Sequence, residues 1–133
     1  MDKLIVMKKA IQIPNAPAPV GPYSQAILAG GMLYISGQIP LNPSTGKLEL
    51  DTIEEATHRV MKNIEALLEA AGLTIENIVK TSIFLKDLND FQAMNTVYAS
   101  YFTGIPPARE TVQVVRLPLD VSIEISCIAL ANG

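Results

Sequence analysis

Two residues in the last quarter of the chain, Arg109 and Glu124, have side chains that could do chemistry together. Arg109 follows Pro106-Pro107, a pair that ends any preceding helix and favours an extended backbone, so it is expected at the start of a strand. Glu124 lies in the apolar run 121–131, where burying a charge costs on the order of several kcal/mol unless a partner is supplied. Arg109 is the natural partner. As alternatives to a shared functional site, the two residues could form a purely structural ion pair, or Glu124 could simply face the solvent.

The run 121–131 is expected to form the last strand, and its period of two assigns side chains to two faces. One face carries Ser122, Glu124 and Ser126, and the other carries Val121, Ile123, Ile125, Cys127 and Ala129. An arginine, a carboxylate, hydroxyls and backbone groups are together suited to holding a small anionic substrate and activating a water molecule.

The composition excludes several other kinds of chemistry. The sequence has one histidine, His58, expected on the exposed face of a helix, and one cysteine, Cys127, expected in the core. It therefore offers no Cys/His set for zinc and no nucleophile–histidine pair. Gly30 and Gly31 are predicted to join strand to strand, whereas a phosphate-binding loop leads from a strand into a helix. We expect no metal site and no cofactor.

The 133 residues are expected to form a single domain, residues 1–133, with residues 1–7 as an N-terminal extension and either Met1 or Met7 as the start. Hydrophobic residues make up 49% of the chain and charged residues only 17%, against about 25% in typical proteins. This deficit suggests that other subunits cover part of the surface. The net charge of −3 disfavours nucleic-acid binding. No stretch is long and apolar enough for a signal peptide or a membrane span, which predicts a cytoplasmic protein.

Six stretches are predicted to form strands. Ala-Gly-Gly-Met at 29–32 is a hairpin signal that joins the second strand to the third. The proline-rich residues 14–19 form a loop that cannot lie inside a sheet, and residues 117–120 form the turn before the last strand. The predicted strands are residues 8–13, a second that opens at 21–26, 33–38, 78–85, 112–115 and 121–131.

A capping box predicts where the first helix begins. The box can take either of two registers, Asp51 with Glu54 or Thr52 with Glu55, and the helix is expected to end at Gly72.

A second helix is expected to start at residues 87–90 and to carry Phe91, Met94, Tyr98 and Tyr101 on one side. The resulting order βββ-α-β-α-ββ predicts an α+β domain with one mixed β-sheet and two helices packed on a single face.

Five motifs in this chain resemble those of the RidA family, the reactive intermediate deaminases, also called the YjgF family. The resemblance runs from about Ala10 to the C-terminus. The motifs are GPYSQA at 21–26, SGQIPLNPSTG at 36–46, EAAGLTIENIVKTSIFLKDLNDFQAMN at 69–95, PPAR at 106–109 and RLPLDVSIEI at 116–125.

The resemblance implies a chorismate-mutase-like fold assembled as a homotrimer, with three equivalent clefts between subunits. It also implies a deaminase that hydrolyses enamines and imines released by pyridoxal-phosphate-dependent dehydratases, such as 2-aminoacrylate and 2-aminocrotonate. The products would be 2-oxo acids and ammonia, formed without a cofactor.

Residue by residue, the resemblance assigns the carboxylate-binding arginine to Arg109 and the acidic catalytic residue to Glu124, which would activate the attacking water. Two positions depart from the family pattern. Thr111 stands where many members have cysteine, and Ser126 where a second glutamate often follows. The implied substrate-binding residues are Tyr23, Ser36, Gly37, Asn95, Arg109 and Thr111.

Two other functions are consistent with the sequence. One is a trimeric small-molecule-binding or chaperone-like regulator that uses the Arg109 cleft without turnover. The other is a ribonuclease or translation inhibitor, an activity attributed to some members of the family, although the acidic charge balance and the absence of a histidine pair argue against it.

Overall fold

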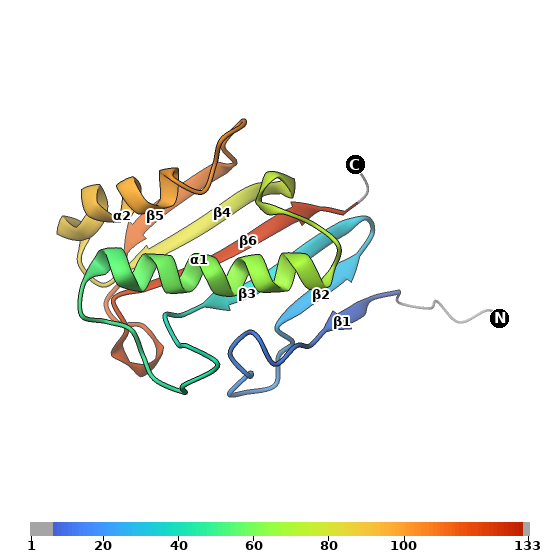
Figure 1. The fold of residues 1–133 in the computed structure, drawn as a ribbon, viewed down its shortest axis with the longest axis horizontal. Helices are drawn as coiled ribbons and strands as arrows, with labels where there is room; N and C mark the ends of the chain where they lie inside the picture. Colours follow the sequence, from blue (N-terminus) through green and yellow to red (C-terminus); the bar gives the residue numbers. More distant parts are fainter. Residues whose placement is uncertain (1–6, 132–133) are drawn as a thin grey trace.

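Six strands form one mixed sheet in the computed structural model, which describes residues 7–131 (Figure 1). Their order across the sheet is β1-β2-β3-β6-β4-β5. Strands β4 and β5 are parallel, and every other neighbouring pair is antiparallel. The strands are β1 (Lys9–Ile11), β2 (Ala26–Ala29), β3 (Met32–Gln38), β4 (Ile78–Leu85), β5 (Ala108–Gln113) and β6 (Ile123–Leu130).

Two helices cover one face of this sheet, α1 (Ile53–Ala70) and α2 (Phe91–Ala99), as Figure 1 shows. No helix covers the other face within the described residues, so the sheet has a covered and an uncovered face. The predicted α+β class, the order βββ-α-β-α-ββ and the placement of both helices on a single face are confirmed. None of the described helices has the length and apolarity needed to cross a membrane. The predicted extension at residues 1–7 lies, apart from Met7, outside the described residues.

The core lies between the helices and the covered face of the sheet. Alternate residues of the central strands point into it, and α1 contributes a stripe with helical spacing. The fully buried side chains at the centre include Leu33, Ile83 and Ile125 from the sheet and Val60, Ile64 and Leu67 from α1.

The hairpin between β2 and β3 is confirmed. Gly30 and Gly31 both have positive φ, 58° and 78°, which is the left-handed backbone that a two-residue hairpin turn requires. The strand predicted at 78–85 also matches β4 at both ends.

The first strand is shorter than predicted because a side chain replaces its sheet partner. Strand β1 ends at Ile11 instead of residue 13. At Ile13 the side-chain amide of Gln25 takes both backbone bonds: Oε1 accepts from Ile13 N at 2.7 Å, and Nε2 donates to Ile13 O at 3.1 Å. Sequence periodicity does not reveal such a substitution.

The strand predicted at 112–115 lies earlier in the structure, as β5. Arg109 is the second residue of this strand, and Val115 is fully exposed beyond its end. The limits of β5 are set by its parallel pairing with residues 80–85 of β4, so a β-branched composition at 112–115 could not locate it.

The second helix also differs from its prediction at its end. Phe91, Met94 and Tyr98 share one side of α2, but Tyr101 lies beyond the helix. Its hydroxyl lies 2.8 Å from Nδ1 of His58 on α1.

The cap of α1 provides a test of the fold's local energetics. Thr52 is the N-cap, and its Oγ1 accepts a hydrogen bond from Glu55 N at 3.0 Å, which selects the second of the two predicted registers. We expect Thr52→Ala to lower the free energy of unfolding by about 1 kcal/mol in urea denaturation, because a helix N–H loses its acceptor. Asp51→Ala is the control, with an expected loss under about 0.5 kcal/mol. A larger loss for Asp51→Ala than for Thr52→Ala would contradict this register.

Candidate active site

Glu124 packs against a bulge in the neighbouring strand β3. Between two paired positions β3 has one residue more than β6, so Ser36 and Gly37 together stand opposite the single residue Ser126. A Cβ placed on Gly37 would lie 2.5 Å from Oε2 of Glu124 and 2.7 Å from its Cδ. Only glycine leaves room for the carboxylate to lie directly on the backbone of the bulge.

The carboxylate of Glu124 is half-buried and lacks a charged or hydrogen-bonding side-chain partner in the described part of the chain. Within residues 7–131 it forms no ion pair and no side-chain hydrogen bond. Burial raises its pKa above the ordinary glutamate value, and no neighbouring charge offsets this effect. Such a group accepts a proton more readily than an exposed glutamate, and its oxygens are free to hold a water molecule or an N–H group.

A cavity of about 410 Å³, which we call the Glu124 pocket, opens beside this carboxylate. Ser36 Oγ donates to Ser24 O at 2.6 Å, which leaves its oxygen as an acceptor. Tyr23 Oη accepts a long bond from Val20 N at 3.4 Å, so its own proton is available to a ligand. Tyr23, Ser36, Gly37 and Glu124 line the pocket with a largely apolar remainder that includes Pro17, Val20, Ile39, Leu41, Pro118 and Leu119.

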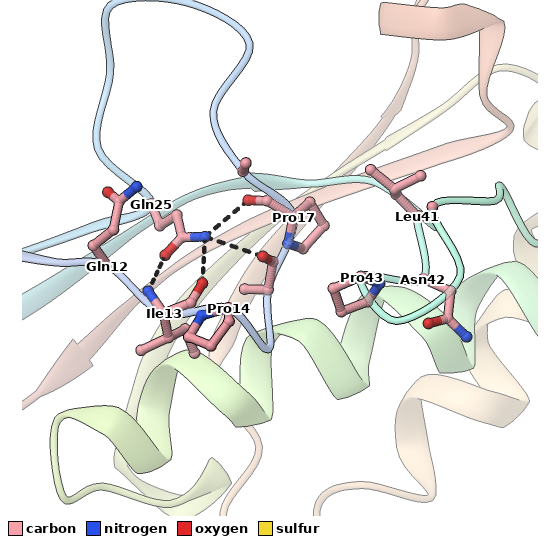
Figure 2. Close-up of a pocket in the computed structure, with 11 residues that line it drawn as sticks. Gln12, Ile13, Pro14, Pro17, Gln25, Leu41, Asn42 and Pro43 are labelled. Atoms are coloured by element: carbon pink, nitrogen blue, oxygen red, sulfur yellow. Dashed lines mark hydrogen bonds between the residues drawn. The ribbon is translucent and has the colours of Figure 1, made fainter.

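The proline-rich loop at 14–19 forms one wall of the Glu124 pocket, and Gln25 holds it in place (Figure 2). Besides its two bonds to Ile13, the buried amide of Gln25 donates to Ala16 O at 3.1 Å and to Pro17 O at 2.9 Å. Prolines have no N–H groups, so this loop depends on a side-chain donor for its shape. Figure 2 is a close-up of a second cavity, which lies between the loop and residues 41–43.

Arg109 lies on the opposite face of the sheet from Glu124. The strand registers align Arg109 with Thr81 of β4 and Thr81 with Cys127 of β6, on the face that the helices cover. Glu124 is aligned instead with Phe84, on the uncovered face. The Arg109–Glu124 ion pair considered from the sequence is therefore not formed within one chain, because strand alternation directs the two side chains apart.

Helix α2 lies over Arg109. The guanidinium carbon Cζ is 5.6 Å from the centre of the Phe91 ring and 5.0 Å from that of Tyr98. Asn95 follows Phe91 by four residues and precedes Tyr98 by three, so it shares their side of the helix. A cavity of about 480 Å³, which we call the Arg109 pocket, is lined by Asn95, Tyr98, Ala99, Phe102, Pro106 and Arg109.

Two polar atoms near Arg109 lack partners. Asn95 Oδ1 and Thr111 Oγ1 are buried and form no hydrogen bond in the part of the chain that the structure describes. Thr111 follows Arg109 by two residues and so shares its face of β5. Because buried polar groups are nearly always hydrogen-bonded, these two atoms are available to a further partner.

The structure thus separates the predicted site residues into two groups. Tyr23, Ser36, Gly37 and Glu124 meet in the Glu124 pocket. Asn95 and Arg109 meet in the Arg109 pocket, with Thr111 beside Arg109 on β5.

Sequence reasoning missed four residues that shape these pockets: Phe91, Tyr98, Gln25 and Leu119. The spacing of Phe91 and Tyr98 predicted that they share one side of a helix. Their contact with Arg109 could not be predicted, because the position of β5 beneath that helix was not known from the sequence. Gln25 lies in the GPYSQA motif, but its role could not be inferred from that motif, because its hydrogen bonds reach residues 8 to 12 positions away.

The single histidine and the single cysteine lie outside both pockets. His58 is exposed on α1, as predicted. Cys127 is buried, and burial raises the pKa of its thiol to about 12, so it carries no thiolate near neutral pH. No three His, Cys, Asp or Glu side chains among residues 7–131 are grouped so that they could hold a metal ion.

The chain is thus an α+β domain that presents a carboxylate in one pocket and an arginine in another. Comparison with known proteins defines the family. The Endoribonuclease L-PSP family pattern matches residues 13–131. The chain belongs to this family, which is the RidA/YjgF family, and the predicted family membership is confirmed.

Two relatives illustrate the similarity. A RutC family protein from Pyrococcus horikoshii is 53% identical over 123 residues, covering 92% of this chain and 98% of the relative. The 2-iminobutanoate/2-iminopropanoate deaminase of Escherichia coli K12 is 48% identical over 127 residues, covering 93% and 98%.

Solved structures agree with this placement. YyfA of the Rid protein family from Yersinia pestis has a TM-score of 0.91 and 50% identity, covering 93% of this chain and 99% of that one. E. coli TdcF with bound serine has a TM-score of 0.88 and 41% identity, covering 92% and 98%. The family fold is therefore present over nearly the whole chain.

The raised pKa of Glu124 predicts a specific pH dependence of stability. When a carboxyl group has a higher pKa in the folded state than in the unfolded state, it lowers the free energy of unfolding as the pH rises from the unfolded-state pKa through the folded-state pKa. We expect Glu124→Gln to be more stable than wild type at pH 7 in urea denaturation, with the difference vanishing below about pH 4.

Glu110→Gln is the matched control with the opposite sign. Hydrogen bonds from Ser82 and Lys80 lower the pKa of Glu110, so its loss should destabilise the protein at pH 7 and have no effect at low pH. A Glu124→Gln variant that is less stable than wild type at pH 7 would mean that the carboxylate has a stabilising partner.

Proposed function

We propose that this protein is a cytoplasmic deaminase that hydrolyses small 2-imino and 2-enamino acids, such as 2-aminoacrylate and 2-aminocrotonate, to 2-oxo acids and ammonia. The observation that carries the proposal is the half-buried carboxylate of Glu124, which forms no ion pair within residues 7–131 and whose pKa burial raises. The same chain presents Arg109 with polar atoms beside it that form no hydrogen bond among the described residues. The similarity to the E. coli deaminase supports the same reaction.

In this proposal Arg109 binds the substrate carboxylate. Its planar guanidinium can donate two parallel hydrogen bonds to a carboxylate, and the hydroxyl of Thr111 can add a third. Asn95 Oδ1 is an acceptor for a substrate N–H group. The relative TdcF was solved with bound serine, a ligand that has a carboxylate next to a nitrogen-bearing carbon, and this supports a similar ligand here.

Glu124 is the proposed general base and acid. It takes a proton from a water molecule as the water oxygen bonds to C2 of the protonated imine. It then returns that proton to the nitrogen and takes up the hydroxyl proton as the C–N bond breaks and the C2 carbonyl forms. The departing ammonia accepts this last proton from Glu124 and leaves as ammonium, which restores the carboxylate. The reaction involves no oxidation or reduction, so these groups need no cofactor. In the Glu124 pocket, Tyr23, Ser36 and Gly37 complete the substrate-binding set.

The two pockets require a second chain to act on one substrate, because they lie on opposite faces of the same sheet. We therefore propose a homotrimer in which the Glu124 pocket of one subunit faces the Arg109 pocket of the next, giving three clefts. Highly exposed apolar side chains support this: Val20 and Leu119 line the Glu124 pocket, and Ile105 lies in the loop beside the Arg109 pocket, between Gly104 and Pro106.

The uncovered face of the sheet offers further contact area for such an assembly. It carries apolar side chains that are only partly shielded in one chain, with Tyr34 45% and Val112 43% exposed. Phe84 and Ile128 lie beside them in the register of the sheet. Coverage of part of the surface by neighbouring subunits would also explain the low proportion of charged residues.

A second candidate is RNA cleavage, since the description of the matching family is endoribonuclease. The net charge of −3 and the lack of a histidine in either pocket favour imine hydrolysis over it. RNA cleavage abolished by Arg109→Ala would assign that activity to this site. A binding-only regulator is distinguished by the turnover assay below.

Turnover is tested with 2-aminoacrylate generated in situ by a serine dehydratase, measuring pyruvate and ammonia release. We expect Arg109→Ala to lower kcat/KM by about 10- to 150-fold, because a charge-assisted hydrogen bond contributes about 1.5 to 3 kcal/mol. Lys62→Ala, which removes the same charge from the exposed side of α1, should retain wild-type activity. No acceleration by wild-type protein would favour a binding-only function.

Mixing inactive variants tests the shared cleft. Trimers of Arg109→Ala and of Glu124→Gln should each have strongly reduced activity, but mixed trimers should regain activity, because one subunit supplies Glu124 and its neighbour supplies Arg109. With random 1:1 exchange, about a quarter of the sites would be intact, one half multiplied by one half. Sedimentation must show trimers before and after mixing. Trimers that mix without regaining activity, or a well-folded monomer, would contradict the shared cleft.

A further inference from the structure

We infer that Tyr98 and Phe91 are positioning residues for Arg109, and that Thr81 fixes Tyr98 in that role. The inference deepens the proposed function and rests on it, since it takes Arg109 as the group that binds the substrate carboxylate. Its basis is the set of contacts that the guanidinium makes in the folded chain.

Arg109 has no acidic partner to orient it. Within the described residues its guanidinium forms no ion pair, and its Cζ atom lies over two aromatic rings, 5.6 Å and 5.0 Å from their centres. A free arginine side chain has many rotamers, so binding a carboxylate would require ordering it first. A cation held over two rings is already ordered before the substrate arrives.

The chemistry of these contacts leaves the hydrogen-bond donors of Arg109 free. The attraction between a cation and an aromatic face uses the charge of the guanidinium, whereas its N–H groups remain available in its plane. An aspartate or glutamate in the same place would occupy those donors and compete with a substrate carboxylate. Aromatic neighbours therefore suit an arginine that must be both fixed and unoccupied.

Tyr98 is itself fixed by the strand next to Arg109. Its hydroxyl lies 2.8 Å from Oγ1 of Thr81, and both side chains are buried. Thr81 is the register partner of Arg109 across β4 and β5. The Tyr98 ring also packs on Phe102, with ring centres 4.8 Å apart. Because the hydroxyl is bonded to Thr81, Tyr98 acts through Arg109 and is not a catalytic residue.

The test compares variants that remove a ring with variants that keep it. For Tyr98→Leu and Phe91→Leu we expect KM for 2-aminoacrylate, and Kd for 2-oxobutanoate by calorimetry, to rise about 3- to 30-fold, with kcat changed less than about twofold. Tyr98→Phe, which keeps the ring, should restore KM to within about threefold of wild type. Thr81→Val removes only the hydroxyl and should raise KM less than Tyr98→Leu does.

Tyr101→Leu is the matched control. It removes a neighbouring aromatic ring that contacts His58 instead of Arg109, and it should leave KM and Kd unchanged. If Tyr98→Leu fails to fold, Phe91→Leu decides the question, because Phe91 is only half-buried at the start of α2.

The outcomes separate this inference from the proposed function. The positioning role would be overturned if the folded Tyr98→Leu and Phe91→Leu variants had wild-type KM and Kd. It would also be overturned if Tyr98→Phe raised KM and Kd as much as Tyr98→Leu does. Neither result would contradict the deaminase activity. If 2-oxobutanoate binding depends on Phe91 and Tyr98 but the wild-type protein shows no turnover, the deaminase activity is contradicted and the positioning role is supported. Wild-type protein that neither binds nor turns over would overturn both.

Discussion

The alternation of side chains along a strand is the constraint on which the rest of this structure depends. It directs Arg109 toward the helices and Glu124 toward the uncovered face, although both lie in the same small sheet. Each side chain lies in a pocket that lacks the other's charge. No change of rotamer can bring the two groups together, because the sheet lies between them. A site that uses both must be built from two chains, so the strand geometry makes assembly a condition of the proposed chemistry.

The same geometry explains why each group stays unpaired. Glu124 lies against the bulge at Gly37, where a side chain would collide with it, and burial raises its pKa. Arg109 is held by aromatic faces that take none of its donors. An intrachain ion pair would have stabilised both charges but would have lowered the pKa of the carboxylate and occupied the guanidinium. Because a sheet has two faces, the two groups are kept apart, and within the described residues neither forms an ion pair.

The sequence was sufficient to predict the secondary-structure elements but not which distant residues and strands they contact. Strand β4, the Gly30-Gly31 hairpin and the start of α1 follow from local patterns of periodicity, turn chemistry and capping. The limits of β1 and β5 do not, because Gln25 and strand β4 set them from elsewhere in the chain. For the candidate site, Arg109 and Glu124 stood out as charges in extended, apolar surroundings. Their placement on opposite faces could not be foreseen, since it depends on the sheet order β6-β4-β5.

Thr111 and Cys127 limit the proposed reaction because neither side chain can act as a nucleophile near neutral pH. Thr111 has a buried hydroxyl beside Arg109 that forms no hydrogen bond within the described residues. The single thiol, Cys127, faces the core with a pKa of about 12 and cannot substitute for it. A hydroxyl at this position can donate a hydrogen bond but does not ionise near neutral pH, so it can help to bind a carboxylate and cannot act as a nucleophile. Proton transfer then falls to Glu124, the one half-buried carboxylate in the wall of either pocket, which is why its environment and not that of Thr111 governs the proposed reaction.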